Sequence, residues 1–162
     1  MISEESALRE KTREWLTERY HNRFLLKPII LHDLQLTVSE YLRRNFTGNV
    51  ILSIPRYNEM DVKPDILSIV RLEAEKLGLI IAECKMNVTI QDFRQTMDYA
   101  RRCQSYEAYL VFYGKLSENV KDRIRMGDNT YYGLNKYGKM VLKKLIIVEY
   151  VGNKTFIVKR RF

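Results

Sequence analysis

The spacing of hydrophobic and polar positions along the chain predicts alternating helices and strands. Apolar residues that recur every three or four positions mark the buried side of a helix, whereas short continuous apolar runs mark buried strands. The predicted helices cover residues 4–23, 33–46 and 89–103, with a short one after Ser117. The predicted strands cover residues 50–57, 66–72, 77–85, 109–113, 145–151 and 155–159. This order favours an α/β fold with a mixed central β-sheet flanked by helices.

Turn signals join some of these strands into hairpins. A short charged turn at residues 73–76 separates the second and third predicted strands, and Gly152–Asn153 is a two-residue hairpin signal before the last one. Residues 130–138 are rich in Tyr and Gly and are predicted to form a loop. The length suits a single domain with one hydrophobic core, spanning residues 1–162.

The first of these hairpins brings charged residues together. Glu83 and Lys85 are two positions apart on a strand, so their side chains leave the same face. Folding the hairpin about its turn places Asp65 opposite Glu83, on that same face. The apolar run 80–82 leads directly into Glu83, and a charge embedded in a buried strand needs a partner or a purpose. The alternative is a pair of strand-terminating surface charges that contributes little to stability.

Two carboxylates and a lysine at one place suit phosphodiester hydrolysis. Two carboxylates can bind Mg²⁺ or Mn²⁺, which prefer oxygen ligands, and the ion polarises the phosphate and lowers the pKa of a bound water. A neighbouring lysine can position or deprotonate that water and offset negative charge in the transition state. The sequence contains no glycine-rich phosphate-binding loop, so no nucleotide cofactor is expected.

These residues resemble the signature of the PD-(D/E)XK nucleases. Pro64-Asp65 is followed by a strand, a turn and a second strand that ends in Glu83-Cys84-Lys85. The resemblance covers residues 33–114 and implies a restriction-endonuclease-like core. It also implies that Asp65 and Glu83 bind the metal and that Lys85 is catalytic, while residues 115–162 form a basic part that matches no motif.

Further positions extend the resemblance. Gln95 and Tyr99 lie four apart on the predicted helix 89–103, similar to the QxxxY element of RecB-like nucleases, and this spacing puts both on one helical face. Members of this family often add a glutamate to the active site from the helix before the first strand. Here Glu40 is the first candidate for that position, and Glu14 and Glu18 are the fallback choices. The segment 40–85 is also similar to archaeal Holliday-junction resolvases. Small stand-alone nucleases of this kind occur among archaeal viruses, which leaves a viral origin open.

Positive charge is concentrated in the last third of the chain. Residues 1–100 carry 14 Lys and Arg against 15 Asp and Glu, whereas residues 101–162 carry 14 against 5. This distribution is typical of a surface that binds a polyanion, although it also occurs on solubilising faces. The terminal hairpin is a candidate wall of a DNA-binding groove, because it carries Lys143, Lys144, Lys154, Lys159, Arg160 and Arg161. The other predicted nucleic-acid contacts lie in the short basic helix and in the Tyr-rich loop, where rings can stack on bases: Lys121, Arg123, Arg125, Lys136 and Lys139.

Several other classes of protein are disfavoured. No run approaches the roughly 20 apolar residues of a membrane span, and no secretory signal is recognised, so an intracellular protein without membrane contact is expected. Cys84 and Cys103 are too few for a disulfide framework. His21 and His32 fall on different predicted elements and indicate no metal site.

Three functions remain open. The first is a Mg²⁺-dependent deoxyribonuclease that acts mainly on double-stranded DNA. The second is a junction resolvase, which would act as a homodimer on branched DNA. The third is a nuclease-fold DNA-binding module that has lost catalysis, and it is the least favoured because Asp65, Glu83 and Lys85 are all present.

Overall fold

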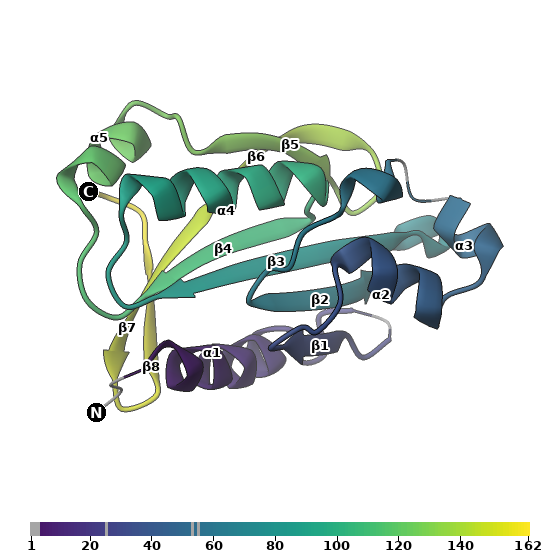
Figure 1. Ribbon diagram of the computed structural model, residues 1–162, viewed down its shortest axis with the longest axis horizontal. Coiled ribbons are helices and arrows are strands. Elements are labelled where there is room, and N and C mark those ends of the chain that lie inside the picture. The colour runs from purple at the N-terminus through teal and green to yellow at the C-terminus, as the bar shows by residue number, and fades with distance from the viewer. Residues whose placement is uncertain (1–3, 25, 53, 55) are drawn as a thin grey trace.

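Helices cover both faces of a central mixed β-sheet (Figure 1). The computed structural model describes residues 4–24, 26–52, 54 and 56–162. One face of the sheet packs against α1 (Glu5–Arg19), and the opposite face packs against four helices. These four helices are α2 (Val38–Asn45), α3 (Gly48–Leu52), α4 (Ile90–Arg102) and α5 (Glu118–Arg125). The predicted α/β class is therefore confirmed.

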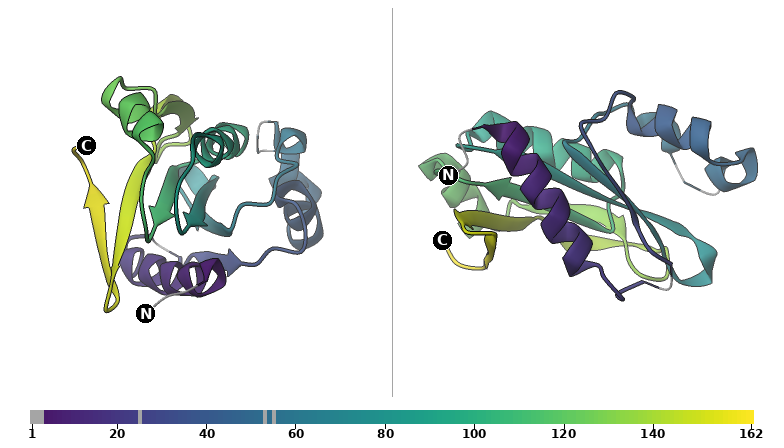
Figure 2. Two further views of the ribbon diagram at one scale, coloured as in Figure 1. Left: turned by 60° about the vertical axis from the view of Figure 1, so that its left-hand side comes forward. Right: turned by 90° about the horizontal axis from the view of Figure 1, so that it is seen from below.

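Within the described residues, the sheet has six strands in the order β1-β2-β3-β4-β7-β8. β3, β4 and β7 are parallel to one another, and the remaining pairs are antiparallel. Figure 2 shows the β7–β8 hairpin at the edge of the sheet away from α2 and α3. The strands are β1 (Ile29–His32), β2 (Ile66–Arg71), β3 (Leu77–Lys85), β4 (Glu107–Phe112), β7 (Ile146–Gly152) and β8 (Thr155–Lys159). A separate two-stranded sheet contains β5 (Thr130–Leu134) and β6 (Met140–Lys144).

The two faces of β3 belong to two hydrophobic cores. Leu79 and Ile81 pack on the α4 side, whereas Ile80 and Ala82 pack on the α1 side. Removing a large aliphatic side chain such as Ile80 from water stabilises the fold by roughly 1.5–3 kcal/mol. Because side chains alternate along a strand, Glu83 leaves β3 on the α4 face. The strand that forms the middle of the sheet thus carries a carboxylate at the end of its apolar run.

Local sequence signals set the ends of two helices. The Thr89 hydroxyl accepts the Asp92 N–H, and the Asp92 carboxylate accepts the Thr89 N–H, which forms a capping box at the start of α4. The Ser117 hydroxyl caps α5 by accepting the Val120 N–H. Both helix starts agree with the sequence prediction. Within the described part of the chain, no helix has the length and apolar character needed to cross a membrane.

The strand predicted at residues 50–57 is wrong. Gly48–Leu52 forms α3 and Tyr57–Glu59 forms a 3-10 turn, while residues 53 and 55 lie outside the described part of the chain. A short apolar run fits either a helix or a strand, and here tertiary packing selects the helix. The edge position is instead taken by β1, whose Ile29–His32 pairs antiparallel with β2.

The loop predicted at residues 130–138 is wrong over residues 130–134, whereas residues 135–138 do form a turn. Thr130–Leu134 forms β5 and pairs with β6, so Tyr131 is buried while Tyr132 is exposed. Gly138 lies at the turn that follows, with a positive φ of 74° that a residue with a side chain adopts only under strain. The Tyr-rich composition therefore reflects a strand with one buried face, as β-propensity allows for aromatic residues.

Candidate active site

Asp65 and Glu83 hold each other through the backbone at the end of the β2–β3 hairpin. The pairing of Ile66 with Ala82 puts the two carboxylates side by side, which confirms the predicted register. The Asp65 N–H donates to Glu83 Oε2 at 2.7 Å, and the Cys84 N–H donates to Asp65 Oδ2 at 2.8 Å. Both carboxylates are therefore fixed by main-chain donors.

Helix α4 supplies a further contact to this pair. Gln95 Nε2 donates to Glu83 Oε1 at 3.1 Å. Tyr99 lies one turn further along α4 and is partly buried. Burial raises the pKa of Tyr99, and so do the negative charges of Glu83 and Asp65, because a phenolate near them would be repelled. The QxxxY positions therefore face the carboxylate pair.

Glu83 is a buried acid beside another acid. Only 2% of its surface is exposed. This burial, followed by the charge of Asp65, raises the pKa of Glu83 to about 8, against the opposing effects of the Asp65 N–H and Lys85. Without a cation, Glu83 is therefore mostly protonated at neutral pH, and a cation held by both carboxylates would take the place of that proton.

Lys85 ends β3 on the same face as Glu83. Its partial burial would lower its pKa, but the charges of Asp65, Glu5, Glu83 and Asp92 raise it. The ammonium group is therefore positively charged at neutral pH. This favours the role of a fixed charge that positions a water and stabilises negative charge, rather than the role of a base.

Arg9 and Asp33 adjoin the site and were missed from the sequence. Arg9 Nε on α1 donates to Asp33 Oδ1 at 2.7 Å, and the Asp33 N–H donates to the Asp65 carbonyl at 3.4 Å. Burial would lower the pKa of Arg9, but the hydrogen bond and charge of Asp33, followed by the charge of Asp65, raise it. His32 Nδ1 lies 3.0 Å from Asp33 Oδ2. The sequence did hold a signal, because the apolar run 29–31 follows Pro28 and leads into His32-Asp33. This segment forms β1, which was not predicted.

The upstream glutamates have other surroundings. Glu40 closes a capping box on α2, where its carboxylate accepts the N–H and the hydroxyl of Thr37. These two bonds hold the pKa of Glu40 below its usual value. Glu14 pairs with Lys11 on α1, which covers the face of the sheet opposite to Glu83, and Glu18 is on the same helix. The α1 glutamate whose charge acts on Lys85 is Glu5, in the first turn of α1.

The predicted nucleic-acid residues fall at two ends of the molecule. Lys136 and Lys139 flank the β5–β6 turn, and the Lys136 carbonyl accepts the N–H of Glu73 in the β2–β3 turn. That turn precedes β3, whose nine residues span roughly 30 Å, so these lysines are far from Glu83. Arg123 on α5 pairs with Asp128. The other two α5 residues, Lys121 and Arg125, line a pocket described below.

The carboxylate pair fits a hard divalent cation. Among residues 4–24, 26–52, 54 and 56–162, no cluster of three or more His, Cys, Asp or Glu side chains is arranged to hold a metal. Mg²⁺, however, commonly takes only one or two protein carboxylates and keeps several waters. The raised pKa of Glu83 is the expected property of a site in which a cation would relieve repulsion between two acids.

Comparison of the chain with protein-family models, with curated proteins and with solved structures gave no match. The likeness to PD-(D/E)XK nucleases therefore rests on the residues Asp65, Glu83, Lys85 and Gln95 and on their arrangement at the end of the β2–β3 hairpin.

Proposed function

We propose that the chain is a metal-dependent nuclease that hydrolyses phosphodiester bonds in DNA, with Asp65, Glu83 and Lys85 at its catalytic centre. The observation that carries this proposal is the buried Glu83 beside the half-buried Asp65, both held by main-chain N–H groups and followed on the same face by a charged lysine. Burying an acid beside a second carboxylate is costly to the fold, and acids with shifted pKa values are common at functional sites.

Each residue has a defined task in this proposal. Asp65 and Glu83 would hold Mg²⁺ or Mn²⁺, and the bound ion would polarise the phosphate and acidify a water. Lys85 contributes a permanent positive charge near the phosphate, where negative charge grows in the transition state. Gln95 orients Glu83 through its amide. Beyond the effect of burial, Tyr99, one turn further along α4, is near enough for the charges of Glu83 and Asp65 to raise its pKa.

The charge distribution supports a polyanionic substrate. A pair of carboxylates repels phosphate, so cationic side chains must bring the backbone to it. Lys85 does this at the site, and the excess of Lys and Arg in residues 101–162 extends positive charge along the molecule. Binding through phosphates is insensitive to base sequence and weakens steeply with salt.

The proposal is tested by incubating the purified protein with linear, circular and four-way-junction DNA in Mg²⁺, in Mn²⁺ and in EDTA. We expect cleavage in the presence of either metal and none in EDTA. Cleavage that is complete in EDTA, or no cleavage of any of the three substrates with metal, would reject the proposed function. Preference for the junction would instead identify a resolvase.

A further inference from the structure

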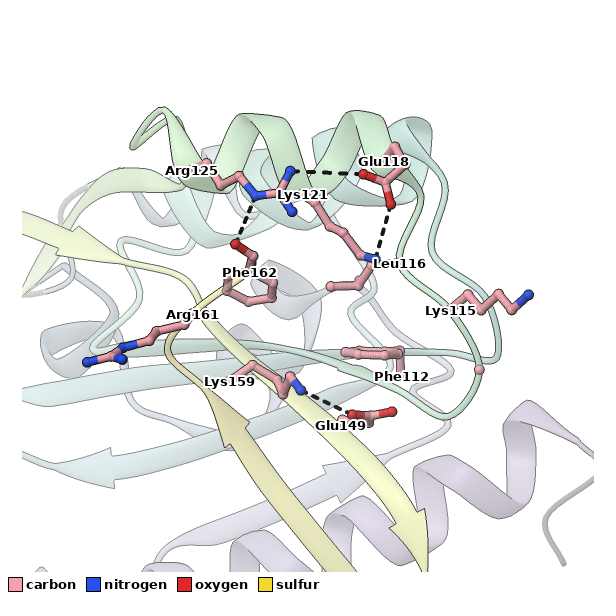
Figure 3. A pocket seen from close by; sticks show the side chains of 11 residues that line it. Phe112, Lys115, Leu116, Glu118, Lys121, Arg125, Glu149, Lys159, Arg161 and Phe162 are labelled. Atoms are coloured by element: carbon pink, nitrogen blue, oxygen red, sulfur yellow. Dashed lines mark hydrogen bonds and ion pairs between the residues drawn. The ribbon is translucent and has the colours of Figure 1, made fainter.

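A basic pocket lies between α5, the end of β4 and the β7–β8 hairpin (Figure 3). Its volume is about 680 Å³. α5 forms one wall and the last residues of the chain after β8 form another, with the Phe112 ring between them. The lining residues are Phe112, Gly114, Lys115, Leu116, Glu118, Lys121, Arg125, Glu149, Lys159, Arg161 and Phe162.

Strand register places this pocket on the same face as the carboxylate pair. Lys85 on β3 pairs with Phe112 on β4, and Phe112 pairs with Glu149 on β7. A second row, one pleat away, runs from Glu83 through β4 and β7 to Lys159 on β8. Strands are about 4.8 Å apart, so Glu149 lies about 10 Å from Lys85, and Lys159 about 14 Å from Glu83, measured along the sheet.

Three of the cations that line the pocket are paired with acids that a phosphate can replace. Lys121 Nζ is 3.2 Å from Glu118, and Arg125 is 3.9 Å from the same carboxylate. On the other wall, Lys159 Nζ is 3.4 Å from Glu149. These pairs are partly solvent-exposed, so each contributes little to stability and is easily exchanged. Lysine binds phosphate through charge-assisted hydrogen bonds that are stronger than neutral ones.

Positive charge prevails in the pocket even when all ion pairs are formed. The lining residues include five Lys or Arg and two Glu. Two of the five cations, Lys115 and Arg161, form no ion pair with any residue that the structure describes. The Arg125 guanidinium also donates to the Phe162 carbonyl, which ties the C-terminal segment to α5 and closes this side of the pocket.

We infer that this pocket binds a backbone phosphate of the substrate strand, about three to four nucleotides from the bond that is cut. The distance follows from the 10–14 Å offset along the sheet and the rise of about 3.4 Å per nucleotide in a duplex. Lys121 and Lys159 bind the phosphate from opposite walls, and Glu118 and Glu149 hold these lysines in its absence. The position relative to the cut rests on the proposed nuclease function, whereas phosphate binding itself does not.

Binding is measured without metal, so that cleavage does not contribute. The probe is a fluorescein-labelled duplex whose anisotropy is followed in EDTA over a range of salt concentrations. The double variant Lys121→Gln/Lys159→Gln should bind more weakly, and its slope of log affinity against log salt should fall by about one unit, as expected for one lost phosphate contact. Conversely, Glu118→Gln/Glu149→Gln should bind more tightly, because the competing carboxylates are gone.

The matched control is Lys27→Gln/Lys76→Gln. Both lysines are exposed. Lys76 immediately precedes β3 and Lys27 lies two residues before β1, which puts them at the end of the sheet far from Glu83. This control removes the same charge and should leave the salt slope unchanged. Equal losses in the pocket and control variants would overturn the inference, because they would show an effect of net charge alone. Thermal unfolding of each variant checks that it folds.

Neutral methylphosphonates then locate the contact, in a duplex short enough to hold one protein and with its cleavage position first mapped in Mg²⁺. Placed one at a time along the strand, they should weaken wild-type binding at a position three to four nucleotides from the cut, and the Lys121→Gln/Lys159→Gln variant should be insensitive at that position. A variant as sensitive there as the wild type would overturn the inference. A failure of the nuclease proposal appears separately, as absence of cleavage by the wild type with Mg²⁺, whereas the salt slopes still decide phosphate binding.

Discussion

The backbone N–H of Asp65 donates to the carboxylate of Glu83 at 2.7 Å, so the residue just before β2 orients the acid on β3. This contact makes the hairpin itself part of the candidate site. Each carboxylate has a main-chain donor, since the Cys84 N–H holds Asp65 in the same way. Such preorganised geometry is what an electrostatic mechanism of catalysis requires.

Replacing Glu83 should abolish turnover without unfolding the protein. Glu83→Gln keeps the shape of the side chain but removes the charge proposed to hold the metal, so the cleavage rate should fall by about a hundredfold or more. The matched control is Glu75→Gln, in the exposed β2–β3 turn, which should cleave like the wild type. Steady-state cleavage of labelled DNA measures both. Wild-type rates in a folded Glu83→Gln protein would remove Glu83 from the mechanism.

Lys85 should act through its charge. Neighbouring carboxylates raise its pKa despite its burial, which disfavours proton abstraction at neutral pH. Lys85→Met should therefore lose about a hundredfold in rate, whereas Lys85→Arg, which keeps the charge, should recover part of it. Single-turnover cleavage of the two variants provides the comparison. If arginine is as inactive as methionine, a role of the lysine as the base becomes the better explanation.

Divalent cations should stabilise the fold through Asp65 and Glu83. Mg²⁺ at about a hundred times its dissociation constant would add about 2.7 kcal/mol to the free energy of unfolding. Thermal unfolding with and without Mg²⁺ should show this increase in the wild type and a much smaller one in Asp65→Asn. Equal stabilisation of both proteins would place the cation elsewhere.

Stability without metal should depend on pH through Glu83. Burial and the charge of Asp65 raise the pKa of Glu83 from 4.5 to about 8 in the folded protein. Between these values the folded state keeps a proton that the unfolded chain releases, so the free energy of unfolding should fall as pH rises from about 4.5 to about 8. Denaturant unfolding in EDTA should show this fall in the wild type and a flatter profile in Glu83→Gln. Parallel profiles for the two proteins would contradict the assignment.

Gln95 should act as a positioning residue. Gln95→Leu removes the amide that donates to Glu83 Oε1 and should lower the cleavage rate by roughly tenfold, with a shift in the Mg²⁺ concentration needed for activity. Gln91→Leu, one turn earlier on α4 and also exposed, is the matched control. The Mg²⁺ dependence of the rate separates the two variants, since a purely structural loss would leave it unchanged.

The centre of the site could be predicted because it lies within one hairpin. The turn at residues 73–76 fixes the register, and the register alone brings Asp65 opposite Glu83. Arg9 and Asp33 could not be found in this way, since they reach the site through the packing of α1 and through β1. A four-residue edge strand has too little pattern to distinguish it from a loop or a helix.

The same limit explains the errors at residues 50–57 and 130–134. Alternation of buried and exposed residues in β5 is clear only once β6 and α4 define which face is covered. The short apolar run that was expected to form a strand becomes α3, because the position beside β2 is already taken by β1. Long, strongly patterned elements such as β3 and α4 were predicted correctly, since their burial pattern is complete within the element itself.

The central position of β3 has a consequence for motion near the site. Ile81 is hydrogen-bonded into the sheet between β2 and β4, so its amide can exchange with solvent only when the sheet opens as a whole. β8, in contrast, pairs with β7 alone among the strands that the structure describes. Hydrogen exchange should therefore be slowest in the strand that carries Glu83 and much faster around Lys159. A bound nucleic acid would then meet a rigid carboxylate pair beside a pocket wall, around Lys159, that can adjust to the path of its backbone.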